Sequence, residues 1–129
     1  AFLTSGWSER ERDPGQSFRW AVATESSLVV RLRERGSYRL QFRAEPFRYD
    51  GAPQPRVTIS VNGDAVAEVE LDAGWTEYQV DIPARTRHRT LTDIRFRYAY
   101  ATSPLEIGMS DDPRPLAVRF DYVRVRTVQ

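Results

Sequence analysis

The 129-residue chain contains no cysteine, which excludes disulfide bonds, thiolate metal sites and cysteine nucleophiles. It also contains no lysine, so all 19 basic residues are arginine, and they nearly balance 18 acidic residues. A formal net charge of +1 is unlike the strongly basic composition of nucleic-acid-binding domains, and we expect no nucleic-acid partner. Arginines and acids alternate along the chain instead, which favours ion pairs between neighbouring strands.

Long apolar runs are also absent. No segment approaches the roughly 20 apolar residues that cross a bilayer, and residues 1–6 lack the basic start and apolar centre of a signal peptide. We therefore expect no direct membrane insertion. The chain does not begin with methionine, and we interpret it as a domain of a larger exported or membrane-anchored protein.

Catalytic motifs are missing as well. The single histidine, His88, lies in the arginine-rich run 85–89, and no nucleophile elbow, zinc-binding His-Glu pattern or phosphate-binding glycine loop occurs. A pair of carboxylates hydrolyses glycosides only when it flanks a cleft at a set separation. We therefore predict that the chain is not an enzyme. The run 85–89 is interpreted as a solvated loop, with binding of an anionic glycan or phosphate as the alternative.

Period-two alternation of apolar and polar residues extends over most of the chain and predicts an all-β fold. Strands are expected at residues 18–22, 27–32, 38–44, 57–61, 65–71, 76–82, 92–100 and 116–127. Asn62-Gly63 separates the fourth and fifth of these and predicts a tight hairpin, because both central residues of a type I′ turn need positive φ. About eight antiparallel strands with long connections predict a two-sheet β-sandwich, most simply a jelly roll, as a single domain over residues 1–129.

The last strand changes its pattern in the middle. Even positions are apolar up to Tyr122, and odd positions join them from Val123 onward. Such a switch predicts either a β-bulge near Asp121 or burial of both faces. We expect the Asp121 carboxylate to be largely removed from solvent and engaged by a metal ion or by an arginine such as Arg19 or Arg119.

Several short motifs together resemble one family. They are Gly6-Trp7-Ser8, Phe18-Arg19-Trp20, the segment 42–47, Val61-Asn62-Gly63, the segment 74–78, the segment 103–106 and the segment 116–123. This order is similar to the galactose-binding-like jelly rolls, which include carbohydrate-binding modules and accessory domains of bacterial extracytoplasmic glycan enzymes. The resemblance spans the whole chain. It implies a sandwich fold, a carbohydrate-binding or accessory role, and an extracytoplasmic location, secreted or at the cell surface.

The resemblance also implies a structural calcium ion. In many such modules an acid near the amino end and an aspartate in the final strand bind it together with backbone oxygens. Asp121 matches the aspartate by position, and Glu9 or Glu11 is the candidate partner. Two acids plus carbonyl groups suffice for the six to eight oxygens that calcium prefers. The alternative is that Asp121 pairs with an arginine and no metal binds.

Aromatic side chains in or beside loops are the candidate ligand-binding residues, since rings stack on the apolar faces of sugars. Trp20, with the aromatic residues of other strands, falls on an apolar position and is predicted to lie in the core. Phe47 and Tyr49 share one loop, and the polar loop residues Asp111, Asp112 and Arg114 complete the predicted site. Our hypothesis is a non-catalytic carbohydrate-binding or accessory domain whose partners are a glycan and the parent polypeptide. The alternative is a structural interaction or self-assembly domain that binds no sugar.

Overall fold

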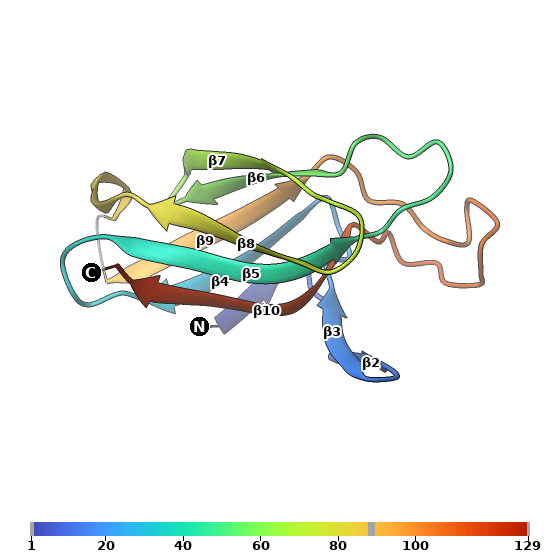
Figure 1. Ribbon diagram of the computed structural model, residues 1–129, viewed down its shortest axis with the longest axis horizontal. Coiled ribbons are helices and arrows are strands. Elements are labelled where there is room, and N and C mark those ends of the chain that lie inside the picture. The colour runs from blue at the N-terminus through green and yellow to red at the C-terminus, as the bar shows by residue number, and fades with distance from the viewer. Residues whose placement is uncertain (1, 88–89, 129) are drawn as a thin grey trace.

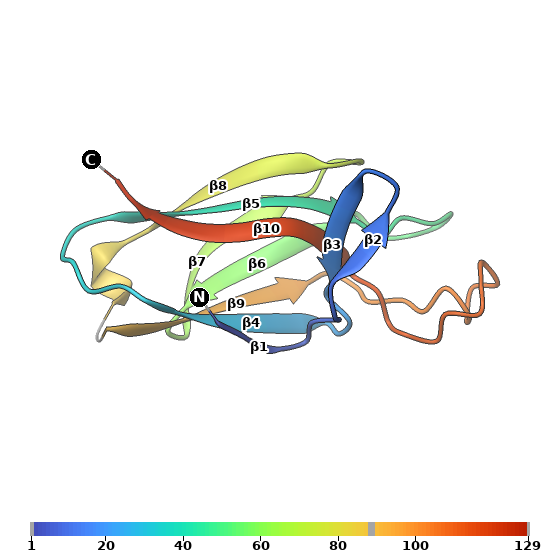
Figure 2. The same cartoon turned by 90° about the horizontal axis from the view of Figure 1, so that it is seen from below.

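In the computed structural model, which describes residues 2–87 and 90–128, ten strands form two antiparallel five-stranded sheets that pack face to face (Figures 1 and 2). The first sheet has the spatial order β1 (Phe2–Ser5), β4 (Glu25–Arg31), β9 (Leu91–Tyr98), β6 (Arg56–Val61) and β7 (Asp64–Glu70). The second has the order β2 (Glu11–Asp13), β3 (Gln16–Trp20), β10 (Val118–Thr127), β5 (Tyr38–Pro46) and β8 (Thr76–Ile82). The all-β, two-sheet prediction is confirmed. The short strands β1 and β2 were not predicted, because neither shows alternating burial.

The core lies between the sheets and is built from alternate residues of each strand. In β5 the inward positions are buried and the outward positions are partly exposed, with strict alternation. Phe42 and Phe120 of the second sheet meet Phe96 of the first, with ring centroids 5.4–5.8 Å apart. Fully burying each such ring stabilises the fold by roughly 1.5–3 kcal/mol. Aromatic packing therefore joins the two sheets at their centre.

The predicted hairpin joins β6 to β7. Asn62 and Gly63 have φ values of 50° and 89°, as a type I′ turn requires. The Asn62 side chain stabilises its own unusual conformation: its amide donates to the carbonyl of Thr86, and its oxygen accepts a bond from the backbone N–H of Asp93, both at 2.9 Å. The pairing of β6 with β7 is confirmed.

The pattern switch in the last strand corresponds to a β-bulge. Phe120 lies opposite Ala44 of β5 and Tyr122 lies opposite Arg43, so Asp121 is the extra residue. The Asp121 carboxylate pairs with Arg43 at 3.0 Å, and its side chain keeps 28% of its surface exposed. The bulge is confirmed, but the predicted extent of burial is wrong. The partner is Arg43 rather than Arg19 or Arg119, because the bulge directs the carboxylate toward β5.

Connections gather at two ends of the sandwich (Figure 1). The end with the long connections 47–55, 71–75 and 99–117 is called the loop end below. The opposite end, called the hairpin end, carries the connection 32–37, the Asn62-Gly63 turn, the 3₁₀ turn Ala84–Thr86 and the end of β10. Across the described residues, no helix has the length and apolar character needed to span a bilayer.

The arginine-rich run 85–89 is only partly described, since His88 and Arg89 lie outside the described residues. Within it, Thr86 is fully buried and Arg87 is half-buried. The interpretation of this run as a solvated loop is therefore wrong for these two residues. The reason is that the 3₁₀ turn packs on the neighbouring hairpin, where the Thr86 carbonyl accepts the Asn62 side-chain bond.

Candidate functional site

Six aromatic side chains form a continuous row at the loop end, called the aromatic row below. In order they are Trp75, Phe18, Trp20, Phe47, Tyr49 and Tyr100, and each step between ring centroids is 5.6–6.5 Å. The row crosses from the outer face of the second sheet to the loops that follow β5 and β9. It brings together rings that come from four separate segments of the chain.

The β3 strand places Trp20 in this row rather than in the core. Trp20 lies opposite Arg119 of β10, so both side chains occupy the outer face of the sheet, whereas Phe120 points inward. The prediction that Trp20 belongs to the core is wrong, since its half-buried ring lies outside the core cluster. Alternation shows that β3 has an apolar face, but the register with β10 decides which face points inward.

Arg119 occupies the space among the rings at one end of the row. Its guanidinium carbon lies 4.6, 5.6 and 5.1 Å from the ring centres of Phe18, Trp20 and Trp75. The same group donates to Asp13 at 2.6 Å and to Glu45 at 2.9 Å. Only 20% of the Arg119 side chain is exposed. This end of the row is thus a packed, charge-balanced cluster that fixes the position of Trp20.

Two open hollows flank the middle of the row. One, of about 360 Å³, is lined by Trp20, Glu45, Pro46, Phe47, Arg48, Gly74 and Arg119. The other, of about 490 Å³, is lined by Arg48, Tyr49, Asp50, Ile107 and Met109. Both volumes fall in the range typical of small-ligand sites. Arg48 lines both hollows, so a single exposed guanidinium is available to groups bound on either side of Phe47.

The two tyrosines of the row are held by hydrogen bonds. The hydroxyl groups of Tyr49 and Thr102 lie 2.9 Å apart, and the Tyr100 hydroxyl donates to the carbonyl of Phe47. Burial, aided by the neighbouring Tyr49, raises the pKa of Tyr100, so its hydroxyl stays protonated as a donor. These bonds tie the loop after β5 to the connection after β9 and fix the orientation of the rings.

The polar residues predicted for the site form a separate cluster. Arg114 donates to Glu11 at 2.7 and 3.1 Å and to Asp112 at 2.8–3.2 Å. The Arg114 hydrogen bonds lower the pKa of both carboxyl groups. Asp111 is exposed and lines neither hollow. Of the five predicted residues, Phe47 and Tyr49 share the aromatic row, while Asp112 and Arg114 instead connect the 99–117 segment to β2.

The predicted calcium ligands are not brought together. Glu11 is engaged by Arg114, Asp121 by Arg43, and Glu9 is exposed on the chain before β2. Within residues 2–87 and 90–128, no three acidic or histidine side chains cluster as metal ligands do. The carboxylates of Glu11 and Asp121 already have guanidinium partners that calcium would have to displace, and Glu9 is not brought to either of them, so these residues do not fit a calcium site.

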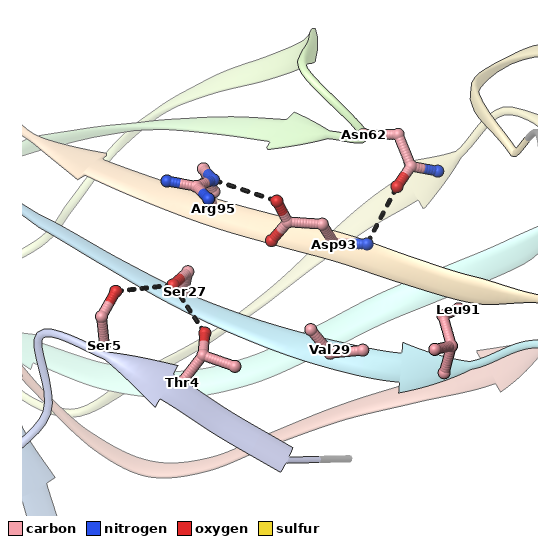
Figure 3. A pocket seen from close by; sticks show the side chains of 8 residues that line it. All are labelled: Thr4, Ser5, Ser27, Val29, Asn62, Leu91, Asp93 and Arg95. Atoms are coloured by element: carbon pink, nitrogen blue, oxygen red, sulfur yellow. Dashed lines mark hydrogen bonds and ion pairs between the residues drawn. The ribbon is translucent and has the colours of Figure 1, made fainter.

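A further polar hollow lies on the outer face of the first sheet (Figure 3). Its side chains bond to one another: Ser27 accepts or donates bonds with Thr4 and Ser5 at 2.7 and 2.8 Å, and Arg95 donates to Asp93 at 3.0 Å. The two bonds of Ser27 attach β1 to β4 at the edge of the sheet. Because its polar groups already have partners, we assign this hollow a structural role.

Glu45, Arg48 and Arg119 line the hollows and were not among the predicted site residues. Arg48 lies between Phe47 and Tyr49 in sequence, so the loop itself carries the signal that could have included it. Glu45 and Arg119 have no local signal, because they meet only through the pairing of β5 with β10, which are far apart in the chain.

Comparison with solved structures finds carbohydrate-binding modules that have a similar fold. A family 35 carbohydrate-binding module from Clostridium thermocellum is similar with a TM-score of 0.56 at 17% identity, over 98% of this chain and 88% of that one. A carbohydrate-binding module of lichenase 5A from Cellvibrio mixtus, in complex with cellotriose, gives a TM-score of 0.53 at 13% identity, over 97% and 89%. The likeness confirms the predicted jelly-roll type of β-sandwich fold.

The C-terminal domain of EclA, a sugar-binding protein, has a TM-score of 0.52 at 12% identity, over 78% of this chain and 64% of that one. This chain therefore spans less than two thirds of that protein's length. No family model matches the chain, and no curated protein sequence matches it.

Proposed function

We propose that this domain is a non-catalytic carbohydrate-binding module that binds a polysaccharide segment along the middle of the aromatic row. The observation that carries the proposal is the arrangement of Trp20, Phe47 and Tyr49 between two open hollows that share Arg48. Rings supply apolar surface for the C–H faces of sugars, and the charged groups beside them bind hydroxyl groups. The modules with the same fold support this proposal.

The charged groups at the hollows suit binding better than hydrolysis. Glu45 is engaged by Arg119, and Asp50 is exposed on its loop. Glycoside hydrolases use two free carboxyl groups on either side of the scissile bond. Within the described residues, Arg48 and Asp50 form no ion pair, so both are available for hydrogen bonds to a sugar. We propose that the domain belongs to a larger extracytoplasmic protein, which it holds on its polysaccharide.

The test combines affinity electrophoresis through gels that contain neutral or uronate-rich polysaccharides with titration calorimetry. Cellohexaose is the first oligosaccharide to titrate, because the Cellvibrio module carries cellotriose. We expect weak binding per site, since exposed polar contacts gain little over water. Trp20→Ala and Tyr49→Ala should each weaken binding by about tenfold, the scale of a lost aromatic contact.

Phe2→Ala is the matched control, because the Phe2 ring is 75% exposed on β1, far from the row. Binding that Phe2→Ala reduces as much as Tyr49→Ala does would contradict the proposed site. If no polysaccharide retards the domain, the carbohydrate proposal fails.

A second candidate function, protein interaction or self-assembly, rests on a different observation. Leu105 and Met109 are 51% and 57% exposed on the 99–117 segment, beside the hollow at Tyr49. Exposed apolar side chains next to an aromatic surface are typical of protein contacts. Concentration-dependent self-association that Met109→Ser abolishes, without any polysaccharide binding, would favour this function.

A further inference from the structure

Most arginines at the hairpin end have no carboxylate partner among the described residues. Within the part of the chain that the structure describes, seven arginines at or near this end form no ion pair: Arg31, Arg33, Arg35, Arg85, Arg87, Arg124 and Arg126. The described acids nearby are Glu34, Asp64, Asp81 and Asp93, of which Asp81 already pairs with Arg39 at 3.1 Å and Asp93 with Arg95 at 3.0 Å. A nearly neutral chain therefore concentrates positive charge at one end.

An open hollow of about 580 Å³ lies within this charge, between the connection 32–37 and the 3₁₀ turn. Arg33, Arg35 and Arg87 line it. Arg87 is fixed in place: it donates to the carbonyls of Glu34, at 3.0 Å, and Gly36, and lies 4.6 Å over the ring of Tyr38. Its Nε is buried without a partner in the described structure. The hollow thus has one preorganised cation and two exposed ones.

The positive charge continues onto the outer face of the second sheet. Arg126 of β10 lies directly opposite Arg39 of β5, and only Arg39 has a carboxylate partner there, Asp81. Like charges directly opposite each other in a sheet are destabilising. Next along the strand, Arg124 stacks on Tyr122 at 3.9 Å. A bound anion would relieve the repulsion between Arg39 and Arg126.

We propose that the hairpin end is a second binding site, for an anionic polysaccharide that carries carboxylate or sulfate groups, separate from the aromatic row. Arginine binds both groups with paired, charge-assisted hydrogen bonds. The exposed arginines extend from the hollow onto the outer face of the second sheet. This distribution suits a flexible polymer with repeating anionic groups. This site would let one domain contact a neutral and a charged glycan at opposite ends.

Two observations favour a polysaccharide over the other polyanions. Single-stranded nucleic acids bind on exposed aromatic platforms, but Arg87 covers Tyr38 and Arg124 covers Tyr122. Membrane surfaces bind through apolar side chains beside basic ones. The large exposed apolar side chains of the described structure that lie toward this end, Phe2 opposite Val29, Leu91 opposite Arg31, and Val128 beside Ser37, come from three separate segments of the chain.

The test measures binding of fluorescently labelled heparin and polygalacturonate by the whole domain at low and at physiological salt. The triple variant R33Q/R35Q/R126Q removes exposed arginines that hold no partner. We expect it to weaken binding by about tenfold, from modest contributions of each exposed charge. The control R56Q/R95Q/R97Q makes the same change in net charge on the first sheet, where these arginines are ion-paired. It should leave the affinity nearly unchanged.

Three outcomes would overturn the proposal: no binding of either polymer at low salt, equal losses in the two triple variants, or equally tight binding of single-stranded DNA. Trp20→Ala and Tyr49→Ala separate the two sites. If they abolish binding of the anionic polymers while R33Q/R35Q/R126Q does not, the anions belong to the aromatic row and the second site is refuted. If anionic binding persists in Trp20→Ala, the second site stands whether or not the aromatic row binds sugar.

Discussion

Arginine has different partners at the two ends of the sandwich. At the loop end, Arg119 contacts two carboxylates and three aromatic rings, and Arg114 contacts two further carboxylates. At the hairpin end, Arg33 and Arg35 have no carboxylate partner among the described residues. Arg114 and Arg119 thus stabilise the fold at one end, whereas Arg33 and Arg35, like Arg48 beside the aromatic row, are available to a ligand. Its role depends on its partners, which neither the number of arginines nor the net charge reveals.

Strand register produces much of this difference. In the pairing of β10 with β5, Arg119 lies opposite Glu45, whereas Arg126, toward the other end of the same strand, lies opposite Arg39. Directly opposite residues on one face interact, so the first pair attracts and the second repels. One pair of strands therefore forms a stabilising contact at the loop end and an unbalanced charge at the hairpin end.

The largest expected effect on stability comes from Arg119→Ala. We expect it to lower the free energy of unfolding by about 2 kcal/mol, because it removes ring contacts and leaves Glu45 without its partner. Arg35→Ala, the matched change at the hairpin end, should stay within about 0.5 kcal/mol of the wild type. Urea denaturation measures both. Equal losses in the two variants would show that the two ends do not differ as the structure indicates.

A smaller effect is expected in the pH dependence of the Arg114 cluster. Hydrogen bonds from Arg114 lower the pKa values of Glu11 and Asp112 in the folded state. A lowered folded-state pKa adds stability above the unfolded pKa, and this stability is lost as the pH falls through the folded value. Acidification through and below the ordinary carboxyl range should therefore destabilise the domain, by about 1 kcal/mol or less for such exposed groups.

Arg114→Gln tests the cause of that acid sensitivity. Without the guanidinium, the pKa values of Glu11 and Asp112 return toward their ordinary values, and the loss of stability on acidification becomes shallower. Melting temperatures measured at a series of pH values would show this, with Arg35→Gln as the charge-matched control. A pH profile unchanged in Arg114→Gln would assign the acid sensitivity to other carboxyl groups.

The sequence was sufficient to predict the strands, the hairpin and the bulge, because each depends on neighbours in the chain. Alternation identifies the strands, Asn62-Gly63 specifies a turn that needs positive φ, and the change of pattern marks the extra residue Asp121. Sequence could not identify Arg43 as the partner of Asp121. That contact depends on which strand lies beside β10, and β5 is far from it in the chain.

The candidate site was predictable only in part for the same reason. Phe47 and Tyr49 lie two residues apart, so their shared loop is visible in the sequence. The inclusion of Trp20 in the row depends on the short pairing of β3 with β10, which turns an apolar face outward. Asp112 and Arg114 are close in sequence to each other, but their third partner, Glu11, arrives from β2. The pairing of distant segments therefore decides which polar side chains are engaged in ion pairs within the domain and which are available to a ligand.

The smallest effect is expected for Asp121, whose pair with Arg43 lies on β10 and β5, which connect the two ends. Asp121→Ala should lower the free energy of unfolding by about 0.5 kcal/mol, since the pair is part-exposed and the bulge accepts other residues.

If Arg43 is the functional partner, the chelator EDTA and millimolar calcium should leave the melting temperatures of wild type and variant unchanged. A melting temperature that falls with EDTA in the wild type, but not in Asp121→Ala, would instead establish calcium as the partner. Arg43 would then have to release the carboxylate when the metal binds, and the loop end would be stabilised by a cation that this structure does not require.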